Sequence, residues 1–408
     1  MLFLYNIMIN IIAFFAYILN KGKIYSDPQW KGRFAKFEKF KDIDLWIHAA
    51  SVGEVKVIGH LIEYLHKINP SIKIHITTMT RSGYKTAFQL YVNQKISISQ
   101  FPFDTKKLVQ KTFDLIQPKV LVIAETEIWP NLILEADNRK IPIILINGRM
   151  SEKAFKQYSI FQKSFAMLLE KYTKLFLKSE NDNNRYSNFV QADKRTIVGD
   201  MKFDAPIIER TQDKIEGIRL ACGIEKDSFV FVAGSTRPGE EELLADLFLK
   251  IYENYKTFNL IIAPRHIERI NEIIDIFSQK GIRFKLYGTS SKHDSVILVD
   301  KVGLLENLYL AADLAFVGGT MTPLGGHNLL EPVWAGVPVV FGNSVFNVQE
   351  SADYILQNNY GTQINTLDEL YTLVEKNIQN EISFKKKTTN DLQNSATSKI
   401  GEYLLKMI

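Results

Sequence analysis

Small residues and a glutamate stand together directly after an apolar run near the start of the chain. Residues 49–54 read Ala-Ala-Ser-Val-Gly-Glu and lie between a predicted strand, Ile43–His48, and a predicted helix, Val55–Ile68. A turn of small residues lets the backbone approach a ligand. Glu54 would begin the helix, whose positive end favours an ionised carboxylate that can accept a proton. The same pattern also fits a glutamate that only stabilises the helix end.

A second acidic cluster follows another predicted strand, Val120–Ala124. Glu125 and Glu127 come directly after this strand, with Trp129 two residues further on. Two carboxylates and an aromatic ring at the end of a strand are suited to a reacting centre. They are equally typical of an acidic helix start, and both interpretations stay open.

Four loops in the second half of the chain carry residue types that bind phosphates and sugars. They are Gly234–Glu240, Pro264–His266, Gly318–Gly319 and Gly325–Pro332. Hydroxyls and amides at a helix start suit phosphate, glycines permit close approach, and a carboxylate can bind a ribose diol. Each loop alone also fits an ordinary turn. Together they favour a nucleotide sugar as ligand.

Several other chemistries are excluded or disfavoured. The chain has no G-x-x-x-x-G-K-[ST] loop and no G-x-G-x-x-G after its first strand. Cys222 is the only cysteine, which excludes a disulfide framework and a cysteine-rich metal site. The seven histidines show no ligand spacing, and the pair Asp42 and Asp44 precedes a strand, so it reads as a solvated turn. We therefore expect no built-in metal centre.

Alternation of short β-branched runs with amphipathic stretches predicts two doubly wound α/β domains. The first series of predicted strands comprises Ile43–His48, Ile72–Thr77, Val120–Ala124, Ile141–Ile146 and Leu175–Leu177. The second comprises Phe229–Ala233, Leu260–Ile262, Val296–Val299, Leu314–Val317 and Val337–Phe341. The predicted helices include Val55–Ile68, Ser82–Tyr91 and Ala154–Glu170. We expect domains at 42–204 and 228–408, a linker at 205–227 around Pro206, and a ligand cleft between the domains.

The N-terminal 41 residues predict a membrane attachment. Residues 1–20 carry no charged side chain and are long enough, as a helix, to reach about 30 Å. Residues 21–41 carry the whole formal charge of +5, with Trp30, Phe34, Phe37 and Phe40 among the cations. Such a segment is typical of an interfacial helix on anionic lipid, with the rest of the chain on the cytosolic side. The alternative is an amphipathic helix that packs on the protein itself.

The ordered motifs resemble those of the 3-deoxy-D-manno-octulosonic acid (Kdo) transferases of lipopolysaccharide assembly. The resemblance extends from the N-terminal helix to about Glu350. It rests on Ser51–Glu54, Thr77–Thr80, Phe101–Asp104, Glu125–Asn131, Asn147–Ser151, Gly199–Asp204, Pro264–His266, Phe316–Gly319 and Gly325–Glu331.

The resemblance implies a glycosyltransferase-B fold of two Rossmann-like domains behind a membrane-anchor helix. It implies an inverting, metal-independent transfer of Kdo from CMP-Kdo to a lipid A precursor (lipid IV-A) on the cytosolic face of the inner membrane. No cofactor is implied, and the partners are the two substrates and anionic lipid. By this similarity Glu54 is the general base, and Glu125 and Lys202 stabilise the transition state.

The same resemblance places the CMP contacts in the second half of the chain. They carry over to Pro264, Arg265, Val302, Gly303, Leu304, Asn328, Leu329, Leu330 and Glu331. One position departs from the family, which often has glutamate where this chain has Leu304, so a contact there would be through the backbone.

Two other functions fit the same architecture. One is a membrane-surface glycosyltransferase that uses a UDP-sugar, and the other is a non-catalytic protein that binds nucleotide sugars. The presence of Glu54 in an intact loop argues against the second. Nucleic-acid binding is least favoured because the basic excess is confined to residues 21–41.

Overall fold

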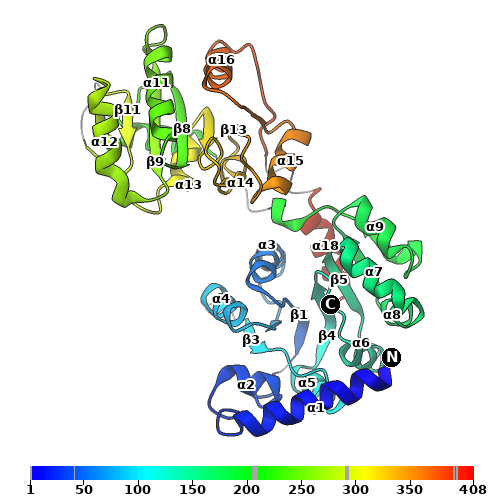
Figure 1. The fold of residues 1–408 in the computed structure, drawn as a ribbon. Helices are drawn as coiled ribbons and strands as arrows, with labels where there is room; N and C mark the ends of the chain where they lie inside the picture. Colours follow the sequence, from blue (N-terminus) through cyan, green and yellow to red (C-terminus); the bar gives the residue numbers. More distant parts are fainter. Residues whose placement is uncertain are drawn as a thin grey trace. The chain divides into compact units, whose positions relative to one another are not determined.

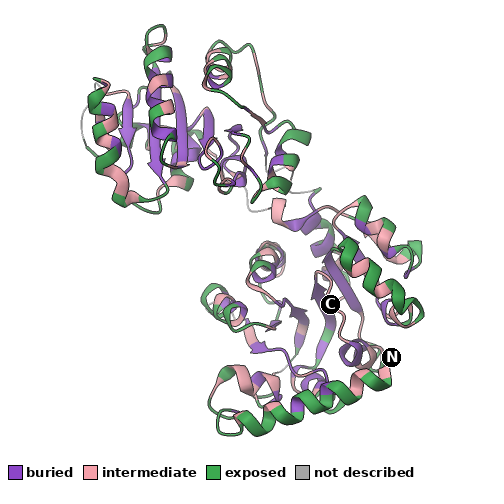
Figure 2. Cartoon of the chain, viewed as in Figure 1, coloured by how far each residue is buried: buried purple, intermediate pink, exposed green. Residues whose placement is uncertain are grey.

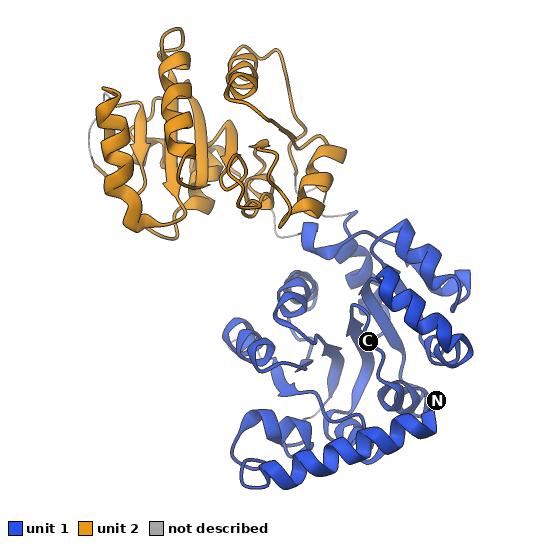
Figure 3. Cartoon of the chain, viewed as in Figure 1, with its two compact units in different colours: residues 1–205, 392–408 blue, residues 206–391 orange. Residues whose placement is uncertain are grey.

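A seven-stranded parallel sheet organises each of the two structural units of the chain. The structure is a computed structural model that describes residues 2–40, 42–92, 94, 96–204, 210–289, 294–388, 391 and 394–408. Unit 1 holds residues 1–205 and 392–408, and unit 2 holds residues 206–391 (Figure 3). Helices cover both faces of each sheet (Figure 1). The predicted α/β class with two Rossmann-like domains is confirmed.

In unit 1 the strand order is β3-β2-β1-β4-β5-β6-β7, and the pairings are parallel. The strands are β1 (Ile43–His48), β2 (Ile74–Thr78), β3 (Ser97–Gln100), β4 (Pro118–Ala124), β5 (Ile143–Gly148), β6 (Lys174–Leu177) and β7 (Arg195–Ile197). The helices are α1 (Leu2–Asn20), α2 (Pro28–Arg33), α3 (Val52–Ile68), α4 (Arg81–Tyr91), α5 (Lys106–Ile116), α6 (Pro130–Asn138), α7 (Glu152–Ile160), α8 (Gln162–Leu169), α9 (Glu180–Tyr186) and α18 (Ala396–Leu405), with 3₁₀ turns η1 (Ala192–Lys194) and η2 (Met201–Asp204).

In unit 2 the strand order is β10-β11-β9-β8-β12-β13-β14, again with parallel pairings. The strands are β8 (Phe229–Thr236), β9 (Phe258–Pro264), β10 (Phe284–Leu286), β11 (Val296–Leu298), β12 (Leu314–Val317), β13 (Val339–Phe341) and β14 (Gly361–Gln363). The helices are α10 (Gln212–Ala221), α11 (Glu240–Tyr252), α12 (Ile270–Gln279), α13 (Leu305–Ala311), α14 (Leu330–Trp334), α15 (Gln349–Gln357) and α16 (Leu367–Ile378), with the 3₁₀ turn η3 (Ile267–Arg269).

The central strands are apolar on both sides because helices bury both faces of a parallel sheet. On β1, Leu45 and Ile47 belong to the core on one face, and Trp46 belongs to the core on the other. Figure 2 shows the consequence, with buried sheets between helices whose outer sides are exposed. The order of the strands reverses between β1 and β4 in unit 1 and between β8 and β12 in unit 2. Ligands bind doubly wound sheets beyond the carboxyl ends of the strands at such a reversal.

Four strands were not predicted, and all four are sheet edges. They are β3, β7, β10 and β14, whose sequences are Ser-Ile-Ser-Gln, Arg-Thr-Ile, Phe-Lys-Leu and Gly-Thr-Gln. An edge strand pairs on one side only and is less enclosed, so it does not need the continuous apolar run that marks a central strand.

The unit boundaries differ from the predicted domains at two places. Helix α10 lies in the predicted linker but belongs to unit 2, because the Arg219 guanidinium donates hydrogen bonds to Ala311 O (2.9 Å) and Asp313 Oδ2 (2.9 Å). Helix α18 lies in the predicted second domain but belongs to unit 1, where Ile400 and Leu404 join the core beside α3. Pro206, which marked the predicted boundary, lies outside the described residues.

Helix α1 lies along unit 1 near α2 and α5 (Figure 1). The Tyr5 hydroxyl donates a hydrogen bond to Asp104 Oδ2 (2.8 Å), and Asn131 Nδ2 donates to Asn6 Oδ1 (2.8 Å). Ile9 and Ala13 are buried, while most other apolar side chains of the helix are exposed. It is the one helix in the described part of the chain that is long and apolar enough to cross a membrane.

The aromatic residues after α1 do not form the predicted interfacial helix. Phe34 is buried, and Phe37 and Phe40 pack against the core of unit 1. For these rings the alternative interpretation, packing on the protein itself, is correct. The Phe34 ring contacts that of Phe103, and the Phe37 and Phe40 rings contact that of His75 on β2. Lys36 and Lys39 remain exposed, and Lys31 and Arg33 are partly buried, whereas Lys41 lies outside the described residues.

The place of α18 in unit 1 predicts the effect of a single methyl group. A Cβ at Gly401 would lie 2.4 Å from Tyr64 Cδ1 of α3, whereas a Cβ at Gly217 of α10 would meet nothing within 4 Å. Gly401→Ala should cost about 1–3 kcal/mol of stability by overpacking. Gly217→Ala should be neutral or stabilise by about 0.5–1 kcal/mol. Hydrogen–deuterium exchange should show lost protection in β1 and β4 for Gly401→Ala alone, and loss confined to unit 2 would contradict the assignment.

Candidate active site

The side chain of Glu54 folds back onto the loop that follows β1. Ser51 is the N-cap of α3, and its hydroxyl donates a hydrogen bond to Glu54 Oε1 (2.8 Å). The Ala50 amide donates to Glu54 Oε2 (2.7 Å), so the side chain is held by two donors and is 8% exposed. The sequence Ser-x-x-Glu is a capping box, which explains locally why the loop turns here.

Burial raises the pKa of Glu54 to about 7. The hydrogen bonds from Ser51 and Ala50 act in the opposite direction, and the charges of Glu125 and Glu127 add to the rise. A carboxyl with a pKa near neutral pH can accept a proton and release it again. The residue predicted as the base therefore has the electrostatics that the role needs.

The loop after β4 brings Glu125 and Glu127 to the same end of the sheet. Glu125 has a φ of +57°, a left-handed conformation that is uncommon outside glycine and is enriched at functional sites. Trp129 Nε1 donates a hydrogen bond to Glu127 Oε2 (2.9 Å), and burial raises the pKa of Glu127. Three carboxylates thus lie around the reversal between β1 and β4, since the charges of Glu125 and Glu127 both act on Glu54.

Lys202 lies in η2, which packs against α3. Its ammonium is 3.8 Å from Asp200 Oδ2 and 4.8 Å from the centre of the Phe203 ring. The backbone of this turn is fixed by Asn147, whose Oδ1 accepts a hydrogen bond from the Met201 amide (3.0 Å). The predicted catalytic side chains Glu54, Glu125 and Lys202 therefore all belong to unit 1.

In unit 2 a buried carboxylate joins the two loops at the strand reversal. Glu240, at the start of α11, accepts hydrogen bonds from four backbone amides of the loops after β8 and β12. The donors are Arg237 (2.9 Å), Gly319 (2.8 Å), Thr320 (3.1 Å) and Met321 (3.0 Å). This carboxylate therefore fixes the loops in which phosphate-binding groups were predicted.

Charged and polar side chains gather around those loops. Arg237 Nε donates a hydrogen bond to His327 Nε2 (3.0 Å). Burial, together with the charges of Arg237 and Arg265, lowers the pKa of His327 to about 4, so its ring is neutral at pH 7. Asn328 Nδ2 donates to Glu331 Oε1 (3.1 Å), and burial raises the pKa of Glu331. These groups combine anion-binding cations with a carboxylate and an amide that suit a ribose diol.

The remaining residues that were predicted to contact CMP form a buried group and an exposed group. Pro264, Leu329 and Leu330 are buried, so only their backbones can reach a ligand. The Val302 side chain is 87% exposed, and Gly303 has a φ of +82°. Leu304 packs against the core beside α13, which agrees with the expectation that any contact there uses the backbone.

Metal-ligating side chains do not gather in the described ranges: no group of three or more His, Cys, Asp or Glu residues there is arranged to hold an ion. Asp44 accepts a hydrogen bond from the Lys73 amide (2.9 Å) and pairs with Lys119 (2.8 Å). Asp42 lies 3.7 Å from the Lys73 ammonium. Both carboxylates of this pair thus contact lysines at the start of β1.

Comparison with known proteins gives the family. Residues 28–205 match the family model described as 3-deoxy-D-manno-octulosonic-acid transferase (kdotransferase). A 3-deoxy-D-manno-octulosonic acid transferase of Haemophilus influenzae is 30% identical over 339 residues, which cover 81% of this chain and 78% of that protein. The chain belongs to the Kdo transferase family. As a member of this family, it is a glycosyltransferase.

One further relative and one solved structure are similar to this Kdo transferase. A bifunctional glycosyltransferase/methyltransferase of Fusobacterium nucleatum is 35% identical over 85% of this chain, and the match spans only 54% of that protein's length. The crystal structure of a UDP-GlcNAc 2-epimerase from Neisseria meningitidis superposes with a TM-score of 0.54 at 13% identity, over 90% of this chain and 99% of that one. The epimerase likeness shows the shared fold alone.

The sequence analysis of this Kdo transferase named Glu240 only as the end of the loop Gly234–Glu240 and missed its role. Its position at the start of a predicted helix was visible, but nothing in the local sequence shows that Gly319, Thr320 and Met321 would surround it. The only signal was the pairing of a Gly-rich loop after β8 with another after β12. Adjacent strands bring such loops together, and the amides of both then need an acceptor.

We predict that replacing Glu240 loosens the loops after β8 and β12. In Glu240→Gln one acceptor oxygen becomes an amide donor that faces backbone N–H groups, which should cost about 1–3 kcal/mol. Glu242→Gln, in the same turn of α11 but exposed, is the matched control. We expect faster hydrogen exchange at Gly319–Met321 in Glu240→Gln only. Equal protection in both variants would show that the carboxylate does not hold the loops.

Proposed function

We propose that this Kdo transferase moves Kdo from CMP-Kdo to a sugar hydroxyl of a lipid A precursor, with Glu54 as the general base. The observation that carries the proposal is the burial of Glu54 beside two other carboxylates, which raises its pKa to about 7. Placing a buried carboxyl beside two half-buried carboxylates is unfavourable for stability, and a catalytic role would account for it. The identity of the transferred sugar as Kdo is inferred from the family to which the chain belongs.

The proposed reaction is a single displacement. The acceptor hydroxyl loses its proton to a Glu54 carboxylate oxygen while its oxygen forms a bond to the anomeric carbon of Kdo. The bond between that carbon and the phosphate oxygen breaks, and CMP departs with the electron pair. Glu125 would stabilise the cationic character at the carbon, and Lys202 would offset negative charge on phosphate or on the Kdo carboxylate.

Unit 2 has the groups to bind the donor. Arg237 and Arg265, in the loops after β8 and β9, would bind phosphate through charge-assisted hydrogen bonds. Glu331 and Asn328 would accept hydrogen bonds from the ribose hydroxyls. Glu240 would hold both loops in place before the nucleotide arrives, which reduces the ordering cost of binding.

We further propose that α1 holds the protein on the cytosolic face of the inner membrane by lying in the lipid interface. Polar contacts from Tyr5 and Asn6 attach one side of the helix to unit 1. The exposed apolar side chains include Leu4, Ile11 and Ile18, which repeat every seven residues and so share a face. The exposed cations of residues 21–39 would add electrostatic attraction to anionic lipid.

The base assignment predicts a pH dependence. Because Glu54 acts as a base only when ionised, kcat/KM for CMP-Kdo-dependent transfer should rise with pH through about 7. Glu54→Gln should reduce the rate roughly 10²- to 10⁴-fold and abolish the rise of kcat/KM with pH. Wild type should lose stability as the pH rises from about 4.5 to about 7, because the folded state must give up a proton that it binds more tightly than the unfolded chain does. Glu54→Gln should lack this loss.

Glu63→Gln, on an exposed part of the same helix, is the matched control and should retain activity. Full transfer by Glu54→Gln would contradict the mechanism. A wild-type protein that transfers only from UDP-sugars would contradict the donor.

The interfacial helix predicts a defined loss of binding. Changing Leu4, Ile11 and Ile18 together to Ser removes apolar burial of roughly 1.5–3 kcal/mol for each side chain. Co-sedimentation with vesicles that contain phosphatidylglycerol should weaken at least tenfold. Leu220→Ser, at an exposed position of unit 2, should bind like wild type. Unchanged sedimentation of the triple variant would contradict the role of α1.

A further inference from the structure

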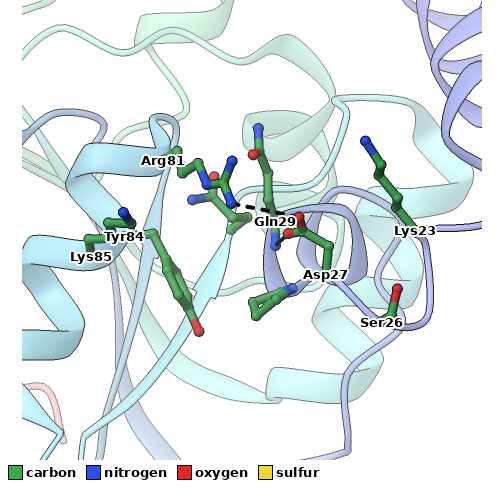
Figure 4. Close-up of a pocket in the computed structure, with 9 residues that line it drawn as sticks. Lys23, Ser26, Asp27, Gln29, Arg81, Tyr84 and Lys85 are labelled. Carbon is green, nitrogen blue, oxygen red and sulfur yellow. Dashed lines mark hydrogen bonds and ion pairs between the residues drawn. The ribbon is translucent and has the colours of Figure 1, made fainter.

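A cavity of about 440 Å³ opens in unit 1 between the turn after α1 and the first turns of α4. This volume lies within the range of small-ligand pockets, about 300–1,000 Å³. Figure 4 shows Arg81, Tyr84 and Lys85 of α4 across from the segment after α1. The lining residues are Lys23, Ser26, Asp27, Pro28, Gln29, Arg81, Tyr84, Lys85 and Gln100.

The charges of the pocket favour an anion. Lys23, Arg81 and Lys85 contribute three cations, against the single carboxylate of Asp27. Arg81 and Lys85 are four residues apart on α4, where like charges repel each other and destabilise the helix slightly. A bound dianion would remove that repulsion. The start of α4 adds the positive end of an eleven-residue helix dipole.

The ion pair between Arg81 and Asp27, the one carboxylate among the described residues that line the pocket, is weak. Arg81 Nη2 lies 4.0 Å from Asp27 Oδ2, and the Arg81 side chain is 68% exposed. Figure 4 shows these two side chains pointing toward each other. An exposed pair at this distance contributes little to stability, so Arg81 is available for a stronger bidentate contact with phosphate at small cost.

The pocket adjoins the loop that holds Glu54. The amides of Met79 and Thr80, which precede α4, donate hydrogen bonds to Ala50 O (3.0 and 3.2 Å), and the Ala50 amide holds Glu54 Oε2. Gln100, which also lines the pocket, contacts the same segment, because its Nε2 donates a hydrogen bond to Thr80 O (3.1 Å). The helix that lines the pocket is therefore joined, through the segment before it, to the loop that holds the candidate base.

We propose that this pocket binds a phosphate group on the sugar headgroup of the acceptor lipid, and that it positions the accepting hydroxyl toward Glu54. The inference rests on the proposed function, since it assumes a glycolipid acceptor. It adds the residues that recognise the headgroup, with Arg81 and Lys85 as positioning residues rather than catalytic ones. A lipid held in the same interface as α1 would bring its headgroup to this position.

The test uses the full chain in vesicles with CMP-Kdo and two acceptors, a phosphorylated lipid A precursor and the same lipid after phosphate removal. Arg81→Glu and Lys85→Glu should each raise KM for the phosphorylated acceptor at least tenfold, with kcat within about threefold. KM for the dephosphorylated acceptor should not respond to either substitution. Arg81→Lys keeps the charge but loses the planar guanidinium that can contact two phosphate oxygens, so it should give an intermediate KM.

Lys67→Glu is the matched control, because it makes the same charge change at an exposed site at the far end of α3, about 20 Å from Glu54. Its KM values should equal those of wild type. Unchanged KM values in Arg81→Glu would overturn the proposal. Equal rises for both acceptors, accompanied by lost binding to phosphatidylglycerol vesicles, would also overturn it and assign the pocket to bulk phospholipid.

Failure of the pocket proposal can be distinguished from failure of the proposed function. If wild type transfers nothing from CMP-Kdo, the proposed function fails. The pocket is then decided by equilibrium binding of the two lipids to wild type, Arg81→Glu and Lys67→Glu. Loss of preference for the phosphorylated lipid in Arg81→Glu alone would still support it, and no difference among the three proteins would overturn it.

Discussion

The reversal of strand order in each sheet is the constraint on which both candidate sites depend. Where neighbouring strands lead to helices on opposite faces, the loops diverge and leave backbone amides that need acceptors. This chain places a glutamate at the start of the helix in both units. Glu240 accepts four amide hydrogen bonds from two loops. Glu54 receives a hydrogen bond from one amide and one from a hydroxyl, and it has two carboxylates as neighbours.

The two glutamates thus differ in how their burial is compensated. Burial raises the pKa of Glu240 too, but four amide hydrogen bonds act against that rise and join the two loops. Glu54 is compensated less, so burial and its acidic neighbours raise its pKa to about 7. The proposed roles rest on this difference: Glu240 would hold the loops that bind the nucleotide in unit 2, and Glu54 would accept the proton in unit 1. In the proposed account, α1 and the cationic pocket would both bring a membrane-bound acceptor to the unit that carries Glu54.

Central features of the fold could be predicted from the sequence, and peripheral ones could not. Strands such as β1 and β4 are buried on both faces and therefore read as apolar runs, whereas the edge strands lack that pattern. Helix α18 returns to unit 1 through contacts such as Gly401 against Tyr64, which no local pattern encodes. The loops that carry Glu54, Glu125 and the donor contacts were visible as motifs. Glu240 and the Arg81 pocket were not, because each depends on partners from segments distant in sequence. The roles of the motif residues remain predictions.

The central claim is that unit 1 activates an acceptor lipid for transfer of a sugar whose nucleotide unit 2 binds. The mass of the lipid product tests it most directly, after the purified chain is incubated in vesicles with CMP-Kdo and a tetra-acylated lipid A precursor. We expect a lipid heavier by a whole number of Kdo residues, with CMP released in equal amount. An unchanged lipid, or a product that forms only when a UDP-sugar replaces CMP-Kdo, would contradict the account.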